Sequence, residues 1–507
     1  MITPAPKKNF SNPALWVLII IYIIVAGFGM LQHELWGDEI HSWNIAKGSG
    51  SFSDLIINTR YEGHPPVWYT ILWMISKFTH DPFSFQVVHF LITSSVVFLL
   101  LFYAPFPITT KILLPFGYFF LYEYAVISRN YSIGILLAFC ICIIIHKNFK
   151  GKLFLYYSIL FLLCNTHILS LLLACSLHLY FLMLNFEQKK RKGLLAVHAA
   201  LGIIISLPAV YFIFPPSDSS LNIDFWKDRW SSEHVKAFAQ APLRSFTPIP
   251  AWWTNNCWNT HVLMEEQHGN NPLRVFNLLF SITLIASAIY FLKQNKKSLV
   301  LFVCNLVLSF IVAVLVFPLT RERYAGFLFI GFIVAYWLCC SEMSIDKQKK
   351  WLITTLLVFQ VIGGVIMMTI DIKRPFSNGY KVNELLKKLP PNEKLVTDYW
   401  AVNTVNAFID QPLYCIDMGK PIPFILWGKD LDEMLAKTNR YTSGTLQYFQ
   451  REGINKVYMI SIASPQTIYQ TDTDFPKTFH VTLIDKIEGA INKGGNLYLY
   501  EITPIKR

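Results

Sequence analysis

The sequence predicts a polytopic α-helical membrane protein with a C-terminal α/β domain, and three observations lead to this fold class. Of the 507 residues, 53% are hydrophobic and only 15% are charged, whereas soluble proteins average about 25% charged residues. The charges are also uneven, because residues 1–371 hold 27 basic and 18 acidic side chains and residues 372–507 hold 17 and 14. Finally, the first part contains many apolar runs that are long enough to cross a bilayer as helices.

About eleven apolar runs are interpreted as transmembrane helices, which makes residues 1–371 the membrane domain and residues 372–507 a soluble domain. The run at residues 153–165 is the shortest, since a full span needs about 20 residues. The runs comprise residues 15–31, 86–103, 110–126, 131–146, 153–165, 167–185, 194–214, 273–292, 299–317, 324–341 and 351–370.

Sixteen Lys and Arg residues gather in one alternating set of short segments, with only three acidic residues among them. Such cations are retained on the cytoplasmic side during membrane insertion. We therefore expect a cytoplasmic N-terminus, extracytoplasmic loops at residues 32–85 and 215–272, and an extracytoplasmic C-terminal domain. The basic segments are residues 7–8, 111, 147–152, 189–192, 293–297 and 347–350.

The formal net charge of +12 does not indicate a nucleic-acid-binding protein. A nucleic-acid site needs basic side chains gathered on one face or groove. Here hydrophobic spans separate the basic segments, so we expect no nucleic-acid partner and assign most of the charge excess to membrane topology.

The first outer loop contains two patterned pieces. Apolar and aromatic residues recur at about helical spacing over residues 36–47, which predicts a helix lying on the membrane surface. Asp38, Glu39 and His41 fall near its start. The second piece, residues 66–78, is apolar but short, which predicts a juxtamembrane or re-entrant helix.

Asp38-Glu39 directly after the first span, the element His64-Pro65-Pro66-x-x-Tyr69, and the topology together resemble a known family. The sequence is similar to the GT-C superfamily of polyprenyl-phosphate-sugar-dependent glycosyltransferases, in the branch with protein O-mannosyltransferases and the lipid A aminoarabinose transferase. The likeness extends over residues 10–370 and the outer C-terminal domain. It implies a bacterial cytoplasmic (inner) membrane enzyme whose active site faces outward.

Sugar transfer from a lipid phosphate needs a carboxylate that accepts the acceptor's proton and cations that stabilise the leaving phosphate. The resemblance assigns the general-base role to Asp38, with Glu39 orienting the acceptor or binding a metal. The alternative is that both acids only cap the surface helix.

Three further residues of this loop are candidates for substrate binding. Glu62 and His64 lie just before the Pro-Pro pair. They could contact sugar hydroxyls or phosphate, or could simply be solvated. His41 is a third candidate, although a histidine on a surface helix commonly faces water.

Arg129, Arg321 and Arg323 lie outside the basic segments, at the outer ends of predicted spans. Because a guanidinium binds phosphate with a planar pair of donors, they are candidates for the donor phosphate, together with the neighbouring Tyr131 and Tyr324. The alternative is that the arginines extend to lipid headgroups or pair with Glu123 and Glu322. Glu123 could also be a second acid of the site.

Metal binding has little support from the sequence, which contains neither His-x-x-x-His on a helix nor Cys-x-x-Cys. A divalent ion at Asp38 and Glu39 stays possible, and no other cofactor is expected. The loop at residues 215–272 is rich in Trp and Asn, which suits sugar stacking or, equally, a membrane interface.

After residue 371 short alternating elements predict an α/β domain with a mainly parallel sheet. No phosphate-binding glycine motif occurs in it. The expected strands are residues 394–399, 412–418, 457–462, 481–487 and 497–502. The expected helices are residues 380–389, 402–409, 430–437 and 444–451.

The leading hypothesis is therefore an inverting membrane glycosyltransferase that uses a polyprenyl-phosphate sugar. Its partners would be this donor, the bilayer and an acceptor that is a protein, a lipid or an envelope glycan. One alternative is an oligosaccharide ligase or polymerase with a polyprenyl-pyrophosphate donor. Another is a flippase or transporter for lipid-linked sugars, for which charges near the bilayer midplane are expected.

Overall fold

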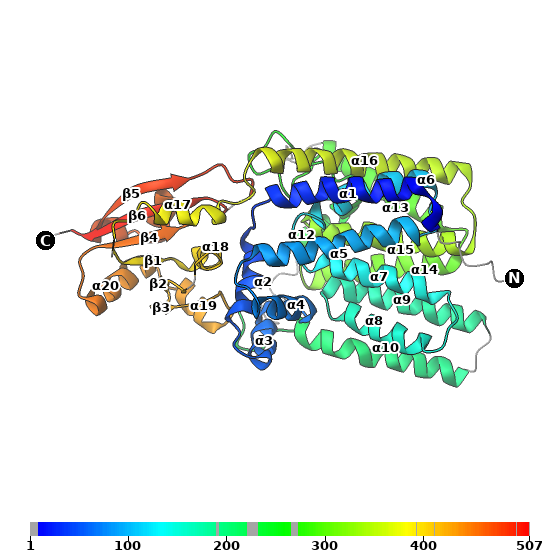
Figure 1. Ribbon diagram of the computed structural model, residues 1–507, viewed down its shortest axis with the longest axis horizontal. Coiled ribbons are helices and arrows are strands. Elements are labelled where there is room, and N and C mark those ends of the chain that lie inside the picture. Colours follow the sequence, from blue (N-terminus) through cyan, green and yellow to red (C-terminus); the bar gives the residue numbers. More distant parts are fainter. Residues whose placement is uncertain are drawn as a thin grey trace.

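The computed structural model describes residues 9–188, 192–220, 232–264, 272–391, 393–409, 411–492 and 494–505. The chain forms a long helical bundle with a sheet-containing part at one end (Figure 1). Eight helices of the described residues are long and apolar enough to cross a membrane. They are α1 (Pro13–Gln32), α5 (Phe83–Phe102), α9 (Ile168–Glu187), α10 (Lys192–Ile213), α13 (Pro272–Leu292), α14 (Lys296–Leu315), α15 (Glu322–Glu342) and α16 (Lys347–Lys373).

These eight helices coincide with eight of the predicted spans, which confirms a mostly helical protein whose long apolar helices are compatible with a membrane protein. Two more predicted spans form the shorter apolar helices α7 (Tyr131–Ile145) and α8 (Lys152–Cys164). Several helices begin at a side chain that accepts a hydrogen bond from the first turn, as Asn12, Asn295 and Asp346 do for α1, α14 and α16. Such caps satisfy backbone N–H groups that have no partner within the helix.

The predicted span at residues 110–126 is not one continuous helix, and this expectation was wrong. The segment consists of α6 (Ile108–Leu113), the 3-10 turn η3 (Leu114–Phe116) and the π-helical turn η4 (Phe119–Glu123). Pro115 has no backbone N–H to donate, and Gly117 adopts an extended conformation. The hydropathy of the segment does not reveal such a break, because the residues on both sides of it are apolar.

The segment at residues 32–85, which was predicted to be the first outer loop, folds into α2 (Gly37–Gly48), α3 (Phe52–Thr59), the 3-10 turn η2 (Arg60–Glu62) and α4 (Val67–Ser76). Both predicted helices are confirmed. The expectation that the first lies on the membrane surface was wrong, because every residue of α2 from Glu39 to Ala46 is buried by protein. The hydrophobic cluster around α2 contains Trp43 of α2, Trp68 of α4 and Ala407 of the C-terminal part. The helix α2 therefore lies between the bundle and the C-terminal part (Figure 1).

The C-terminal part contains one six-stranded sheet with the strand order β3-β2-β1-β4-β6-β5. The strands are β1 (Leu395–Thr397), β2 (Tyr414–Cys415), β3 (Lys420–Pro421), β4 (Val457–Ser461), β5 (Phe479–Ile487) and β6 (Leu497–Pro504). The helical elements around it are η5 (Gly379–Lys381), α17 (Val382–Leu386), η6 (Tyr399–Ala401), α18 (Val402–Asn406), α19 (Lys429–Leu435), α20 (Arg440–Glu452), α21 (Pro465–Thr471) and α22 (Phe475–Thr478).

The expectation of a mainly parallel sheet was wrong, because the sheet is mixed. β1 pairs in parallel with β2 and β4, whereas β3, β6 and β5 are each added by antiparallel pairing. β5 and β6 are joined by a short connection, and a parallel pair needs a crossover of a dozen residues or more. The five predicted strands are nevertheless all present.

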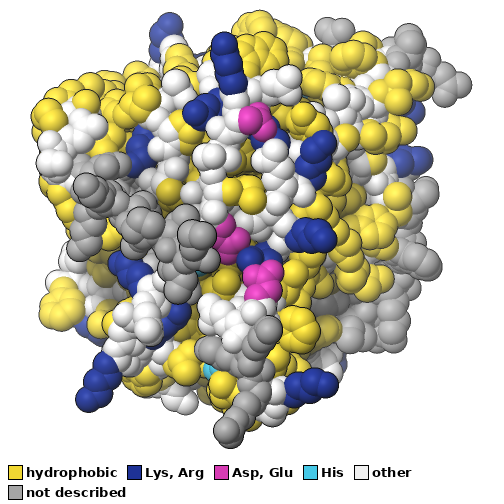
Figure 2. Space-filling model, turned by 90° about the vertical axis from the view of Figure 1, so that its right-hand side faces the viewer, with side chains coloured by type: hydrophobic (Ala, Val, Ile, Leu, Met, Phe, Trp, Pro, Cys, Tyr) yellow, Lys and Arg dark blue, Asp and Glu magenta, His cyan; other side chains and the backbone are white. Residues whose placement is uncertain are grey.

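The two ends of the bundle differ in charge. At the end opposite the sheet, Lys and Arg side chains surround the face while Asp and Glu are few (Figure 2). The basic segments of the sequence connect helices at this end, as between α7 and α8 and between α15 and α16. The other end carries α2, α4 and the sheet, and the helix α12 (Ser232–Phe246) packs against α13 and α15.

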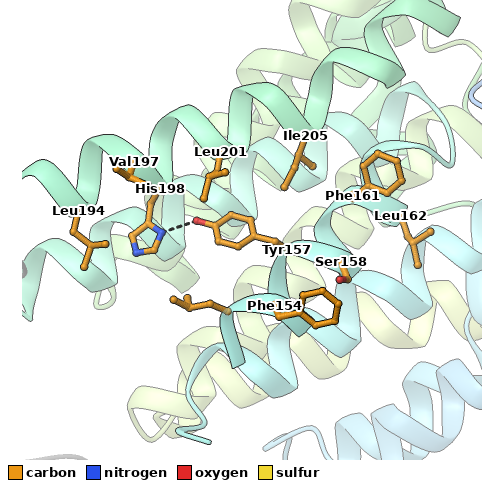
Figure 3. Close-up of a pocket in the computed structure, with 11 residues that line it drawn as sticks. Phe154, Tyr157, Ser158, Phe161, Leu162, Leu194, Val197, His198, Leu201 and Ile205 are labelled. Carbon is orange, nitrogen blue, oxygen red and sulfur yellow. Dashed lines mark hydrogen bonds between the residues drawn. The ribbon is translucent and has the colours of Figure 1, made fainter. Parts of the chain in front are cut away.

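A groove of about 730 Å³ opens between α8 and α10 (Figure 3). Its walls are almost entirely apolar, and Tyr157 and His198 share a hydrogen bond of 2.6 Å across it. The groove runs along most of α8 and the first half of α10, and none of its lining residues belongs to the site described next.

Candidate active site

Asp38 lies in the first turn of α2, and two arginines from distant parts of the chain converge on it. Its Oδ2 is 3.3 Å from Nη2 of Arg323 and 4.0 Å from Nη2 of Arg129. The Asp38 side chain is 40% exposed, while those of Arg323 and Arg129 are only 11% and 8% exposed. The three residues therefore form a partly open ionic centre within largely apolar surroundings.

Arg129 lies in the turn between η4 and α7, and it is held by the backbone of α2. Its Nη1 donates to the Asp38 carbonyl oxygen and, over 3.1 Å, to Oγ of Ser42. Ser42 in turn donates to the same carbonyl oxygen at 3.1 Å. These bonds fix the guanidinium beside the start of α2, and the Arg129–Glu123 pair considered from the sequence does not form.

Arg323 lies in the first turn of α15, inside an aromatic cage. Its guanidinium carbon is 5.1 Å from the ring centre of Trp36, 5.3 Å from that of Trp258 and 4.9 Å from that of Tyr324. Nη2 also donates to the Tyr324 hydroxyl at 3.3 Å. Cation–π contacts of this kind hold a guanidinium in place without using up all of its donors.

Both arginines retain unused hydrogen-bonding capacity. Nε of Arg129 and Nε of Arg323 are buried and have no hydrogen-bond partner among the described residues. A buried donor without a partner costs free energy, which an anion bound between the two guanidiniums would recover. The centre thus combines an accessible carboxylate with two cations suited to an oxyanion.

Glu62, His41 and His64 lie beside this centre. His41 Nε2 is 2.7 Å from Oε2 of Glu62, and its Nδ1 accepts a 3.0 Å hydrogen bond from Asn403 of α18. Burial opposes protonation of His41, but the Glu62 charge outweighs it and the pKa of His41 is raised. His41 therefore does not face water, and it joins the outer loop to the C-terminal part.

His64 has the opposite electrostatic environment. Burial, reinforced by the positive charge of Arg129, lowers its pKa to about 3. Its ring is neutral at physiological pH and can donate or accept a hydrogen bond. Nδ1 of His64 and Oε1 of Glu62 are buried without a partner among the described residues, so both keep capacity for a polar ligand.

Both predicted tyrosines border the centre: Tyr324 contacts Arg323 directly, and Tyr131 lies close enough to Arg323 and Arg129 to interact with their charges. Tyr131 packs against Tyr124 and His167, with ring centres 5.5 Å and 5.0 Å apart. Arg321 is different, because its side chain is exposed and it only precedes α15. Arg321 therefore does not join the centre as the sequence analysis expected.

Glu39 and Glu123 occupy structural positions instead of the substrate-facing positions considered for them. Glu39 is fully buried and accepts hydrogen bonds from the N–H groups of Trp36 and Ser128. Its other contact is His33. Glu123 accepts from the Tyr118 hydroxyl at 2.9 Å and from Nε1 of Trp258 at 3.0 Å. Both carboxylates hold neighbouring elements together, and Oε1 of Glu123 in addition is buried without a hydrogen-bond partner among the described residues.

The residues do not fit the divalent ion considered for Asp38 and Glu39. The two carboxylates have no partner in common, since Asp38 contacts arginines and Glu39 contacts His33 and backbone N–H groups. Within the described part of the chain, no group of three His, Cys, Asp or Glu side chains is arranged to hold a metal.

Three residues near the centre were not singled out from the sequence. Trp258 was one of several Trp residues in its loop, of which Trp226 and Trp230 lie outside the described residues. His167 caps α9 and packs on Tyr131, and its place in an outer turn was the available signal. His33 follows the first span directly, but its partner Asp371 is 338 positions away.

The sequence matches no protein-family model, and no curated protein matches it. What the site does is therefore argued from its own residues.

Proposed function

We propose that this protein is an inverting membrane glycosyltransferase that moves a sugar from a polyprenyl-phosphate donor to an outer acceptor. The observation that carries the proposal is the half-exposed Asp38 carboxylate held between Arg129 and Arg323. A lone structural ion pair needs only one cation. Two buried cations around one accessible carboxylate favour a site that also receives a second anion.

The proposed reaction uses each part of this centre. The acceptor oxygen or nitrogen attacks the anomeric carbon, a new glycosidic bond forms, and the bond from that carbon to the phosphate oxygen breaks. Asp38 takes the acceptor proton as general base. The electron pair leaves with the polyprenyl phosphate, whose developing negative charge Arg129 and Arg323 stabilise.

A lipid-linked donor is supported by where the centre lies. It is at the end of the apolar bundle, between the first turns of α2 and α15, so a phosphate at the membrane surface would reach it while its tail stays in lipid. With the basic residues gathered at the other end (Figure 2), we infer that this end faces outward from a bacterial cytoplasmic membrane.

The decisive experiment is transfer of radiolabelled sugar from polyprenyl-phosphate donors by the purified protein in nanodiscs. Asp38→Asn should lose about 10²- to 10⁴-fold in turnover, the amount that general-base catalysis supplies, while donor binding persists. Asp81→Asn is the matched control, because Asp81 is an exposed acid of the same outer segment.

Three outcomes would count against the proposal. Full turnover of Asp38→Asn with a confirmed donor would remove Asp38 from the reaction. Activity restricted to pyrophosphate-linked donors would favour a ligase or polymerase, and movement of a lipid-linked sugar across the membrane without transfer would indicate a flippase.

A further inference from the structure

His33 joins three elements at the base of the candidate active site. It ends α1, and its ring lies between two acidic side chains from different helices. Nε2 is 3.1 Å from Oε2 of Glu39 in α2, and Nδ1 is 2.8 Å from Oδ2 of Asp371 in α16. The side chains of His33 and Glu39 are 0% exposed and that of Asp371 is 2% exposed.

Both ring nitrogens face carboxylate oxygens, so with both acids ionised each nitrogen must carry a hydrogen for the two contacts to be hydrogen bonds. A protonated imidazole also places one positive charge between the two buried carboxylates, which lowers the cost of burying them. Burial alone would lower the pKa of His33, but Asp371 and Glu39 raise it well above its usual value. The junction is thus a buried acid–imidazolium–acid bridge.

The bridge extends to the reacting centre through Glu39. Oε1 of Glu39 accepts a 2.5 Å hydrogen bond from the backbone N–H of Ser128. Glu39 directly follows Asp38 in the chain, and Ser128 directly precedes Arg129. Besides the direct bonds of Arg129 to α2, the proposed base and one proposed phosphate ligand are therefore also linked through a carboxylate that His33 holds.

We propose that His33 is a positioning residue, which fixes Glu39 against Asp371 and thereby holds Asp38 and Arg129 in register. The role of His33 in turnover rests on the proposed glycosyltransferase function. Its effect on the position of the Asp38 side chain does not depend on that function. His33 does not touch the reacting atoms and is not a catalytic residue.

The kinetic test compares His33→Ala with the wild-type protein in the transfer assay. A shift of about 1 Å in a reacting group can cost roughly 10²-fold in rate, so kcat should fall by about 10- to 100-fold while KM for the donor changes little. Asp371→Asn keeps an oxygen acceptor for the ring and should retain most turnover, whereas Asp371→Leu should not. His178→Ala is the matched control, since His178 is a buried histidine that bonds Tyr156 away from α2.

A second readout does not depend on activity. Asp38→Cys is labelled with a water-soluble maleimide in the wild-type, His33→Ala and His178→Ala backgrounds. If His33 fixes the start of α2, the labelling rate at position 38 should rise several-fold in His33→Ala only. This measurement stays informative if no donor is found for the wild-type protein, which would reject the proposed function alone.

The inference is overturned if His33→Ala keeps wild-type kcat and unchanged labelling, or if His178→Ala lowers kcat and raises labelling as much. If His33→Ala does not fold, the comparison of Asp371→Asn with Asp371→Leu replaces it as the test. Equal kcat and equal position-38 labelling in Asp371→Asn and Asp371→Leu would then reject the bridge, and a clear difference between them would support it.

Discussion

At the scale of single residues, two neighbouring acids of the same helix turn have different environments. Asp38 points to an open centre beside two arginines, while Glu39 is enclosed and satisfied by protein donors. Successive residues of a helix point in directions about 100° apart. One can therefore face a substrate while the next holds the structure.

The arginine next to Asp38 gives a test of phosphate binding. Arg323→Ala should lower kcat/KM by about 10- to 100-fold, because a charge-assisted hydrogen bond to the donor and to the leaving phosphate is lost. Arg323→Lys should recover only part, since lysine keeps the charge but not the planar pair of donors. Steady-state kinetics with a confirmed donor measures both.

Arg321→Ala is the control for this series, because Arg321 is exposed and two positions from Arg323. Its kinetics should match the wild type. Unchanged KM and kcat in the Arg323→Ala protein would mean that Arg323 has only a structural role.

His64 gives a pH-dependent test. Burial and Arg129 lower its folded-state pKa to about 3, whereas an unfolded chain binds the proton near pH 6.5. The unfolded state therefore gains stability as the pH falls below 6.5, and the folded protein loses up to about 2 kcal/mol by pH 5.

Replacing His64 by Gln should remove this contribution. Thermal melts in detergent between pH 7.5 and 5 should show a smaller fall in Tm for His64→Gln than for the wild type. Parallel curves for the two proteins would mean that His64 titrates normally in the folded state.

At the scale of elements, the broken segment at residues 108–123 depends on a close approach of α16. A Cβ on Gly363 would lie 2.1 Å from the Pro248 carbonyl oxygen, and a Cβ on Gly364 would lie 3.0 Å from the Phe116 carbonyl oxygen. Because backbone atoms cannot move aside cheaply, Gly364 lets α16 pack directly on the irregular turns that lead to Arg129, and Gly363 lets it pack against the backbone at Pro248.

Gly363→Ala should therefore destabilise the protein by about 1–3 kcal/mol, the usual effect of overpacking. Gly193→Ala is the matched control, because a Cβ there meets nothing within 4 Å and alanine favours a helix. Thermal unfolding monitored by size-exclusion chromatography in detergent compares the two. Equal midpoints would mean that α16 can shift away from Pro248 without cost.

At the scale of the whole molecule, the basic end and the sheet-bearing end are separated by the length of the bundle (Figure 1). The positive-inside rule predicts that the basic end is cytoplasmic. A cysteine at exposed Thr473, in the C-terminal part, should react with a membrane-impermeant maleimide in intact cells. A cysteine at exposed Lys150 should react only after permeabilisation. The reverse pattern would invert the topology and move the candidate site to the cytoplasm.

The sequence by itself determined the features that depend on local composition and period. Apolar runs of span length located the long helices, and alternating apolar residues located the strands of the sheet. Asp38, Arg129 and Arg323 were also identifiable, because charged groups at the outer ends of apolar spans are costly unless they are used. These signals are read within one segment and need no knowledge of its neighbours.

Only the tertiary structure decided which segments meet. It brought Arg323 to Asp38 across 285 positions and Asp371 to His33 across 338 positions. It buried α2 and Glu39 and added antiparallel strands to the sheet. Such pairings follow from the packing of whole elements, in which a carboxylate buried without partners would be unstable. No local sequence pattern indicates which distant residue will form a hydrogen bond or ion pair with such a carboxylate.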